Sequence, residues 1–191
     1  MNYYDKHADT YINSTVSVDM SFQYSLFLPY LPKGASILDA GCGSGRDSRH
    51  FLEQGYKVEA FDNSRAMVEH ARALTGLAVR KLSFAELDYD STFDGIWACA
   101  SLLHVPRVEL GFVFGLLHRA LKPQGLLYCS FKDRPEDFTN EGRLFTCFTE
   151  QGFHAFLSEL SLFGLVQLSH SADVRQGRGN ERWLNILLAR K

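Results

Sequence analysis

Short apolar runs alternate with amphipathic segments between residues 36 and 131. The apolar runs predict buried strands, and the segments between them, in which apolar residues recur every three or four positions, predict helices. Strands are expected at 36–40, 57–61, 77–82, 93–98 and 125–131. Helices are expected at 46–54, 64–74 and 106–121. This alternation predicts a Rossmann-like α/β fold, with a doubly wound, mostly parallel sheet and helices on both faces.

The first 35 residues follow a different pattern. Residues 1–18 carry Tyr4 and Tyr11 among polar residues with little periodicity, and they predict a loop or a loose helix lying over another part of the molecule. Asp19 can cap a helix that begins at the next residue. Apolar residues then recur at helical spacing at Phe22, Leu26, Phe27 and Tyr30. This helix should cover one face of the sheet.

The chain changes character again after residue 131. A loop at 132–148 should lead into a helix at 149–163, which is followed by apolar strands at 165–168 and 183–189. Two strands with no helix between them should pair antiparallel. We therefore expect a sheet of seven strands that has an antiparallel C-terminal strand and this hairpin at one edge.

A glycine-rich turn, 41–45, follows the first expected strand and precedes the helix at 46–54. Glycines permit positive φ and close approach of a ligand, and the N–H groups of a helix N-terminus suit an anionic group. Asp39 would repel a pyrophosphate but can accept hydrogen bonds from an ammonium group, so a zwitterionic amino-acid end fits both features. Arg46 stands where the dinucleotide fingerprint needs its third glycine, which disfavours a nicotinamide cofactor. The alternative is a turn that only lets a helix pack on the sheet.

Further candidate residues follow the other strands, because ligands of open α/β sheets bind at the carboxyl ends of the strands. Asp62 ends the second strand, about where an acidic residue binds ribose hydroxyls in Rossmann-like sites, and Asn63 can assist it. The alternative role for Asp62 is to cap a helix beside Ser64. Phe84 follows the third strand and offers an aromatic face to a purine, with a place in the core as the alternative.

The fourth strand leads into residues 99–105, where small side chains leave room beneath a cofactor and His104 stands at the mouth of the site. His104 is the best candidate for a general base, and its alternative role is to support the next helix. Trp97 and Trp183 lie in expected strands and are assigned to the core. Cys42 is expected to be structural rather than nucleophilic.

Composition narrows the class of protein. The 191 residues, 46% of them hydrophobic, fit one globular domain, and a net charge of −2 argues against nucleic-acid binding. The four cysteines form no Cys-x-x-Cys pair, so neither a zinc site nor a disulfide framework is indicated, and a reducing cytoplasm fits. The polar N-terminus and the absence of a long apolar run predict neither a signal peptide nor a membrane span.

These motifs together resemble those of class I S-adenosylmethionine-dependent methyltransferases. The resemblance is carried by Leu38-Asp39-Ala40-Gly41-Cys42-Gly43-Ser44-Gly45, Asp62, Phe93-Asp94-Gly95-Ile96 and Leu121-Lys122-Pro123-Gln124-Gly125. Gly45-Arg46-Asp47-Ser48 and Gly55-Tyr56-Lys57-Val58 are also similar to the tellurite-resistance branch of that family. The reversed last strand is a further family feature.

The resemblance implies that the cofactor is S-adenosylmethionine and that the chain has three functional segments. Residues 1–35 would form an N-terminal lid and helix, 36–131 the cofactor-binding core, and 132–191 the acceptor side of a single methyltransferase domain. Asp39 and the glycine loop would hold the methionine end, and Arg46 would bind its carboxylate or only cap the helix. The cofactor-binding residues expected in total are Tyr11, Asp39, Gly41, Cys42, Gly43, Arg46, Asp62, Asn63, Met67, Phe84, Ala85, Ala100, Ser101 and Leu102.

The acceptor is expected to be a small molecule, for example a metalloid oxyanion such as tellurite or selenite, and a soft or anionic acceptor would need no base. Contacts with it are expected from Tyr4, Lys132, Arg143 and Arg178, although exposed basic side chains are usually only solvated. The alternative function is a cofactor-binding regulator or partner subunit without turnover. We expect a monomer or homodimer, with no metal and no nucleic-acid or membrane partner.

Overall fold

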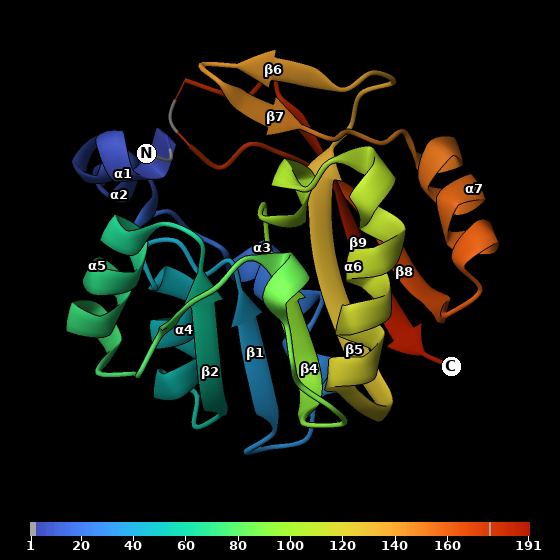
Figure 1. Ribbon diagram of the computed structural model, residues 1–191, viewed down its shortest axis with the longest axis horizontal. Helices are drawn as coiled ribbons and strands as arrows, with labels where there is room; N and C mark the ends of the chain where they lie inside the picture. The colour runs from blue at the N-terminus through green and yellow to red at the C-terminus, as the bar shows by residue number, and fades with distance from the viewer. Residues whose placement is uncertain (1–2, 176) are drawn as a thin grey trace.

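The computed structural model describes residues 3–175 and 177–191, which form one curved seven-stranded sheet with helices on both faces (Figure 1). Its strands run in the order β3-β2-β1-β4-β5-β9-β8. The first five are parallel, and β9 lies antiparallel between β5 and β8. Their bounds are β1 Ser36–Ala40, β2 Lys57–Asp62, β3 Arg80–Lys81, β4 Phe93–Ala98, β5 Leu121–Lys132, β8 Phe163–Ala172 and β9 Arg182–Arg190. The predicted fold class and the antiparallel hairpin at the sheet edge are confirmed.

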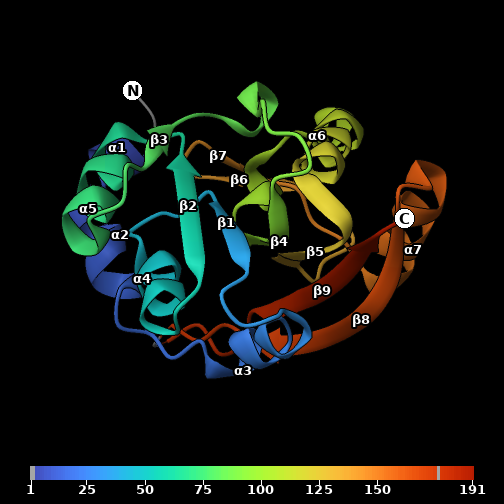
Figure 2. The same cartoon turned by 90° about the horizontal axis from the view of Figure 1, so that it is seen from below.

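Helices lie on both faces of this sheet and over its carboxyl end. One face is covered by α3 (Ser21–Ser25), α4 (Arg46–Glu53) and α5 (Arg65–Thr75), and the other by α6 (Arg107–Ala120) and α7 (Glu150–Leu160) (Figure 2). Helices α1 (Tyr3–Lys6) and α2 (Ala8–Thr15) lie beyond the carboxyl ends of the strands, as does the small hairpin of β6 (Phe138–Asn140) and β7 (Arg143–Phe145) (Figure 1). Three short 3-10 turns complete the elements: η1 Leu28–Tyr30, η2 Phe84–Glu86 and η3 Leu102–His104.

Side-chain alternation along the strands divides the core in two. Ile37 of β1 packs with Phe51 and Trp97 under α3 and α4, whereas Leu38 packs with Leu110 under α6. Trp97 is fully buried and stacks on Tyr128, with ring centroids 4.0 Å apart. The assignment of Trp97 to the core is therefore confirmed, and residues of β1 that share the face of Ile37 point toward α4.

The helix that follows β2 begins and ends as its sequence predicts. Ser64 caps α5, because its hydroxyl oxygen accepts a hydrogen bond from the Met67 N–H at 3.3 Å. Gly76 ends the same helix with φ of 74°, a left-handed conformation that favours glycine. The carboxyl end of β2 is thus held against a well-defined helix start.

The structure differs from the expected secondary structure in two places and decides between the alternatives in a third. The strand expected at 77–82 is reduced to Arg80–Lys81, because at the sheet edge it pairs only with the end of β2. Of the segment expected to be a loop or a loose helix, residues 3–6 and 8–15 form α1 and α2, while residues 1–2 lie outside the described residues. The hairpin of β6 and β7 was not expected within the loop at 132–148.

The helix expected from Met20 is also shorter than its pattern suggested. The helix ends at Ser25. Of the four apolar residues in the pattern, Leu26 and Phe27 are buried, whereas Phe22 and Tyr30 are 47% and 51% exposed. It therefore covers only part of that sheet face.

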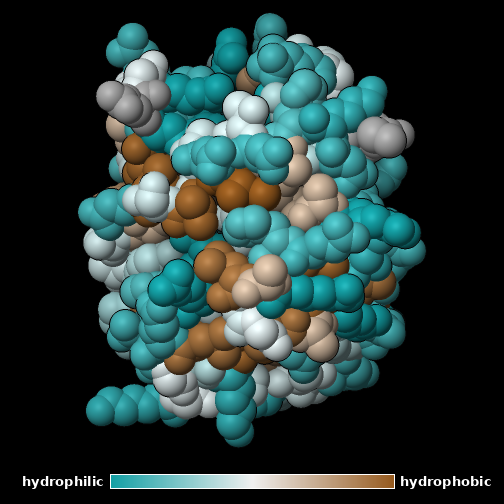
Figure 3. Space-filling model, turned by 90° about the vertical axis from the view of Figure 1, so that its left-hand side faces the viewer, coloured by the Kyte–Doolittle hydropathy of each residue, from teal (hydrophilic) through white to brown (hydrophobic). Residues whose placement is uncertain are grey.

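The outer surface is mixed in character. On the side of α2 and α5, apolar side chains are interrupted by hydrophilic ones (Figure 3). In the described part of the chain, no helix has the length and apolar character needed to cross a membrane. Within the same residues, no group of His, Cys, Asp and Glu side chains is arranged to hold a metal ion.

Candidate functional site

Two adjoining cavities lie at the carboxyl ends of the parallel strands. The first, here the Asp62 cavity, is lined by Asp62, Asn63, Met67 and Phe84 among others. The second, here the Lys132 cavity, extends from the glycine loop to Lys132 at the end of β5. Seven residues line both cavities: Tyr4, Tyr11, Gly41, Gly43, Ala100, His104 and Arg143. The two cavities are therefore halves of one cleft, and we call these seven residues the junction.

The glycine loop takes its shape from left-handed residues. Gly41, Gly43 and Gly45 have φ of 77°, 53° and 83°. A Cβ on Gly41 would lie 2.6 Å from Ser101 Cβ, so this position also needs glycine for space. The N–H groups of Gly41 and Cys42 donate to the Phe61 carbonyl at 3.0 and 2.9 Å. These two N–H groups therefore join the loop to β2 instead of facing a ligand.

The structure does not bring Asp39 into the cleft. Its side chain is 2% exposed, accepts a hydrogen bond from Ser48 Oγ at 2.5 Å, and lies between β1 and α4. Burial, helped by the nearby Asp47 carboxylate, raises the pKa of Asp39 to about 8. Asp39 therefore supports α4, the helix that follows the glycine loop. Its side chain does not line the cleft in which a cofactor amine was expected to contact it.

A second carboxylate, Asp47, organises the wall of the Lys132 cavity. Arg46 Nε and Nη2 donate to it at 2.7 and 2.8 Å, and Trp97 Nε1 and the Tyr24 hydroxyl donate at 2.9 and 2.6 Å. Burial would raise the pKa of Asp47, but Arg46 and the other donors hold it below its usual value. Arg46 Nη1 also donates to the Thr15 carbonyl at 3.1 Å, which joins α2 to the loop. Arg46 lines the cleft as predicted.

Asp62 lies in the cleft, as its position after β2 predicted. Its Oδ2 accepts from the Gly43 N–H at 2.9 Å and its Oδ1 from the Ser64 N–H at 2.8 Å. The Asn63 N–H also bonds to this carboxylate, which has about four acceptor sites, so Asp62 keeps acceptor capacity for a ligand hydroxyl. Burial raises the pKa of Asp62 above its usual value. Asp62 thus both fixes the glycine loop and faces the cavity.

Other predicted residues divide between cleft and core. Phe84 packs edge-on against Phe61 at 5.2 Å and lines the Asp62 cavity, as do Asn63, Met67 and Ser101. Cys42 lines the Lys132 cavity, and burial raises the pKa of its thiol. Leu102 is fully buried in the core and is not a lining residue, and Ala85 is not one either.

His104 and Tyr4 meet at the junction from opposite walls. Tyr4 Oη lies 2.7 Å from His104 Nε2, and His104 Nδ1 lies 2.8 Å from the Leu144 carbonyl oxygen. Burial lowers the pKa of His104 to about 4, and the nearby Arg143 charge adds to this effect. The imidazole is therefore neutral near pH 7.

The N-terminal lid, α1 and α2, is fastened over the cleft. Asp5 Oδ1 accepts from Ser64 Oγ at 2.6 Å, and the Tyr3 hydroxyl donates to Glu141 at 2.9 Å. Arg143 lies over the Tyr3 ring, with its Cζ 3.9 Å from the ring centroid. The lid therefore bridges α5 and the turn between β6 and β7, and its Tyr4 and Tyr11 line the junction.

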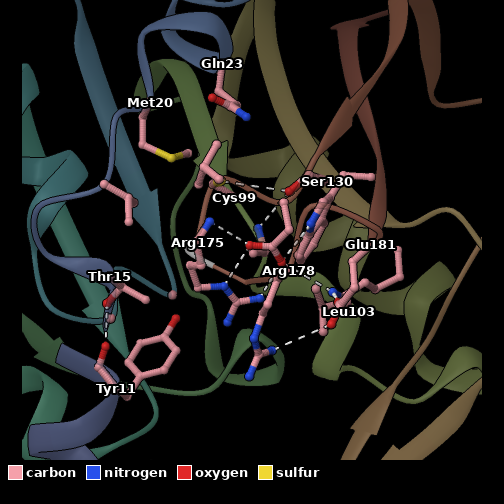
Figure 4. Close-up of a pocket in the computed structure, with 18 of the residues that line it drawn as sticks. Tyr11, Thr15, Met20, Gln23, Cys99, Leu103, Ser130, Arg175, Arg178 and Glu181 are labelled. Atoms are coloured by element: carbon pink, nitrogen blue, oxygen red, sulfur yellow. Dashed lines mark hydrogen bonds and ion pairs between the residues drawn. The ribbon is translucent and has the colours of Figure 1, made fainter. Parts of the chain in front are cut away.

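The far end of the Lys132 cavity is strongly charged. Lys132 forms ion pairs with Glu181 and, at 3.6 Å, with Asp173, and its Nζ lies 4.4 Å from the Trp183 ring centroid. Burial lowers the pKa of Lys132 to about 8. Arg175 donates to both oxygens of Asp173, at 2.9 and 2.5 Å. Figure 4 shows Arg175 and Arg178 projecting between the side of Tyr11 and the side of Ser130.

The predicted acceptor residues Tyr4, Lys132, Arg143 and Arg178 all line this cavity. Among the described lining residues, five are basic (Arg46, Lys132, Arg143, Arg175 and Arg178) and three are acidic (Asp47, Asp173 and Glu181). The cavity therefore has an excess of positive charge.

Several lining residues were missed. Trp183 was assigned to the core but lines the cavity, because β9 begins beside the carboxyl end of β5, where Trp183 is paired with Lys132. Gln23 is 5% exposed, faces the cavity and has an Oε1 without a hydrogen-bond partner among the described residues. Further lining residues that were not predicted include Thr15, Asp47, Ser130, Asp173 and Glu181. The only signal for Asp173 and Glu181 was the polar stretch between the last two strands, in which Arg175 and Arg178 were acceptor-side candidates.

The central part of the chain is similar to known proteins. Residues 37–125 match the family model of a methyltransferase domain. The cypemycin N-terminal methyltransferase of a Streptomyces species is 30% identical over 115 residues, which are 57% of this chain and 46% of that protein. The chain thus spans less than half the length of the curated relatives it matches.

Solved structures confirm the class I methyltransferase fold over nearly the whole chain. The Burkholderia thailandensis 1,6-didemethyltoxoflavin-N1-methyltransferase, solved with 1,6-didemethyltoxoflavin and S-adenosylhomocysteine bound, has a TM-score of 0.81 at 24% identity and covers 98% of this chain and 84% of its own. A TehB-like S-adenosylmethionine-dependent methyltransferase from Corynebacterium glutamicum has a TM-score of 0.69 at 21% identity, covering 99% and 98%. At these identities the likeness establishes the fold alone, and it does not distinguish the tellurite-resistance branch.

Proposed function

We propose that this chain transfers a methyl group from S-adenosylmethionine to a small-molecule acceptor. The observation that carries the proposal is the single cleft in which Asp62 lines one half and Arg46 the other, with Gly41 and Gly43 of the glycine loop lining both. The match of residues 37–125 to a methyltransferase domain supports it.

The cleft offers a matching group for each part of this cofactor. The free lone pairs of Asp62 would accept hydrogen bonds from the two ribose hydroxyls, and Phe84 would contact the adenine. The methionine end would extend past Gly43 toward Arg46, whose guanidinium retains N–H groups for a carboxylate. The sulfur joins these two ends, so it would lie at the junction.

Such a site needs little chemistry beyond placement. The methyl carbon is already activated by the sulfonium, and holding two reactants in line is worth about 7–11 kcal/mol of the barrier. Tyr4 and Tyr11 of the lid line the junction, and the neutral His104 is available there as a base. Acceptor-side contacts come from Lys132, Arg143 and Arg178.

The charge of the Lys132 cavity indicates which kind of acceptor fits. The excess of basic residues in the Lys132 cavity suits an acceptor with negative charge. Tellurite or selenite is the acceptor suggested by the resemblance of residues 45–48 and 55–58, and this suggestion is tested directly below. A cytoplasmic location, and a monomer or homodimer, remain predictions from the sequence.

Calorimetry tests the cofactor site. S-adenosylhomocysteine should bind the wild type, and Asp62→Asn should weaken binding about tenfold or more, because it removes charge from the acceptor of two hydroxyl bonds. Asp88→Asn is a matched control, since Asp88 is an exposed carboxylate paired with Arg80 outside the cleft. Equal affinity of Asp62→Asn and the wild type would count against the proposed site.

Transfer of a labelled methyl group from S-adenosylmethionine separates an enzyme from a regulator. Purified protein should label one or more small acceptors in a panel that includes tellurite and selenite. Tight cofactor binding with no labelled small molecule, in the panel or in a deproteinised cell extract, would favour the alternative of a binding protein without turnover.

A further inference from the structure

The hydrogen-bonded pair at the junction has a defined proton arrangement. The Leu144 carbonyl can only accept, so the hydrogen of the neutral His104 ring lies on Nδ1. His104 Nε2 therefore carries a lone pair, and the Tyr4 hydroxyl, 2.7 Å away, donates to it. A proton leaving Tyr4 already has its acceptor in place.

This arrangement also fixes what Tyr4 presents to the cleft. A phenol has one O–H donor, and that donor points at His104, so toward other groups Tyr4 Oη acts only as an acceptor, and Arg143 is one side chain that is hydrogen-bonded to it. Tyr4 and His104 both line the two cavities. Burial raises the pKa of Tyr4, while the Arg143 guanidinium, 5.8 Å from its ring, opposes that rise. A cation is thus placed where a developing tyrosinate would need it.

The position of the pair relates it to methyl transfer. On the proposed function, the ribose lies in the Asp62 cavity and the amino-acid end in the Lys132 cavity, so the sulfonium between them lies at the junction. Tyr4 and His104 are the junction side chains that are joined as a donor and an acceptor. An acceptor molecule that enters from the Lys132 cavity would meet the methyl group and Tyr4 Oη together.

We infer that Tyr4 and His104 form a proton relay, and that the acceptor is a small molecule that loses a proton from O–H or N–H when it is methylated, such as a phenol or an N–H heteroaromatic. This inference rests on the proposed function. The acceptor gives its proton to Tyr4 Oη while Tyr4 gives its own proton to His104 Nε2. The electron pair left on the acceptor bonds to the methyl carbon, and the pair of the broken C–S bond stays on sulfur.

Charge is conserved at the junction during this step. The positive sulfonium becomes a neutral thioether as the neutral imidazole becomes an imidazolium, which then releases its proton to solvent. A ring held neutral by burial can accept a proton more readily once the neighbouring cation is lost. Metalloid oxyanions already present a lone pair and need no base, so the relay favours proton-bearing acceptors over tellurite or selenite.

A panel of acceptors tests the relay with the full chain. The panel contains ring-substituted phenols of graded acidity, N–H heteroaromatics, tellurite and selenite, and formation of S-adenosylhomocysteine is followed. For phenols that are un-ionised at the assay pH, Tyr4→Phe and His104→Gln should each lower kcat/KM about 10²–10⁴-fold. For phenols that are already ionised, the loss should disappear. The double variant should be no worse than either single one, because the two groups act as a unit.

The matched control is Tyr89→Phe, which removes a hydroxyl that donates to Glu59 outside the cleft and should leave activity on every acceptor unchanged. Tyr3→Phe probes the lid, because its hydroxyl bonds to Glu141 and not to His104. Any loss in Tyr3→Phe should be the same for ionised and un-ionised phenols. A loss in Tyr3→Phe as large as in Tyr4→Phe would mean that lid closure, not proton transfer, explains both, and would overturn the relay.

Calorimetry of S-adenosylhomocysteine binding, done before the activity assays, distinguishes a failure of the proposed function from a failure of the relay. If S-adenosylhomocysteine does not bind, the proposed function fails, and the relay with it. If it binds but only tellurite or selenite is methylated, or no member of the panel is, the inferred acceptor class is wrong. Losses that are equal for ionised and un-ionised phenols would assign Tyr4 and His104 to positioning. Nitrogen NMR that finds the neutral His104 protonated at Nε2 would overturn the relay without any activity assay.

Discussion

The replacement Gly41→Ala measures how tightly the glycine loop is constrained. Two costs add at this position. A left-handed φ of 77° costs an alanine about 1–2 kcal/mol, less the roughly 0.4–1 kcal/mol gained by restricting the unfolded chain. The added Cβ would also lie 2.6 Å from Ser101 Cβ, and such overpacking typically costs about 1–3 kcal/mol. We expect a total loss of about 2–4 kcal/mol in the free energy of unfolding.

Urea denaturation with two companion variants separates these costs. Gly34 has φ of 72°, and no atom lies within 4 Å of the point that a Cβ would occupy, so Gly34→Ala should show the backbone cost alone, about 1 kcal/mol or less. Adding Ser101→Gly to Gly41→Ala removes the contacting atom and should recover part of the loss. If Gly41→Ala were no more destabilising than Gly34→Ala, the close approach of the loop to Ser101 would be refuted.

Two further predictions concern the buried carboxylates behind the loop. The pKa of Asp39 is about 8 in the folded protein, whereas an unfolded carboxyl loses its proton near pH 3.8, so the free energy of unfolding of the wild type should fall as pH rises between these values. Asp39→Asn should make the free energy of unfolding less dependent on pH, as measured by denaturation at several pH values. An unchanged pH dependence would contradict the raised pKa of the buried Asp39. Asp47→Asn removes the charge of a buried carboxylate that accepts from Arg46, Trp97 and Tyr24, and should cost about 1–3 kcal/mol by the same assay. The exposed control Asp88→Asn should change stability little, and equal effects at the two sites would argue against the Asp47 network.

The parts of the site that could be predicted from sequence are those set by local structure. Asp62 and Ser64 stand where a strand ends and a helix begins, and both the cap and the cleft position follow from that local boundary. The positive φ of Gly41 and Gly45 follows equally from a strand–turn–helix sequence. The parallel arrangement of the first five strands, with helices on both faces, needed only the alternation of strands and helices and the handedness of their connections.

The role of Asp39 could not be predicted because it depends on which face of β1 a residue occupies. Side chains alternate along a strand, so Asp39 shares the face of Ile37 and points at Ser48 of α4 instead of into the cleft. The position of Trp183 depends on where β9 begins against β5, a pairing between segments far apart in the chain. Local patterns carry no information on such register.

The pairing of Tyr4 with His104 was likewise beyond the reach of sequence. The two side chains are separated by 100 positions and come from a short helix and a 3-10 turn. Both were candidates individually, but the tautomer of His104 became evident only with the Leu144 carbonyl in place. The same limit applies to the hairpin of β6 and β7, which supplies that carbonyl.

A crystal structure of the full chain with S-adenosylhomocysteine tests the central claim most directly. We predict the ribose hydroxyls on Asp62, the amino-acid end beside Gly43 and Arg46, and the sulfur at the junction next to Tyr4. A ligand bound elsewhere, or bound in this cleft with its ribose away from Asp62, would contradict the account.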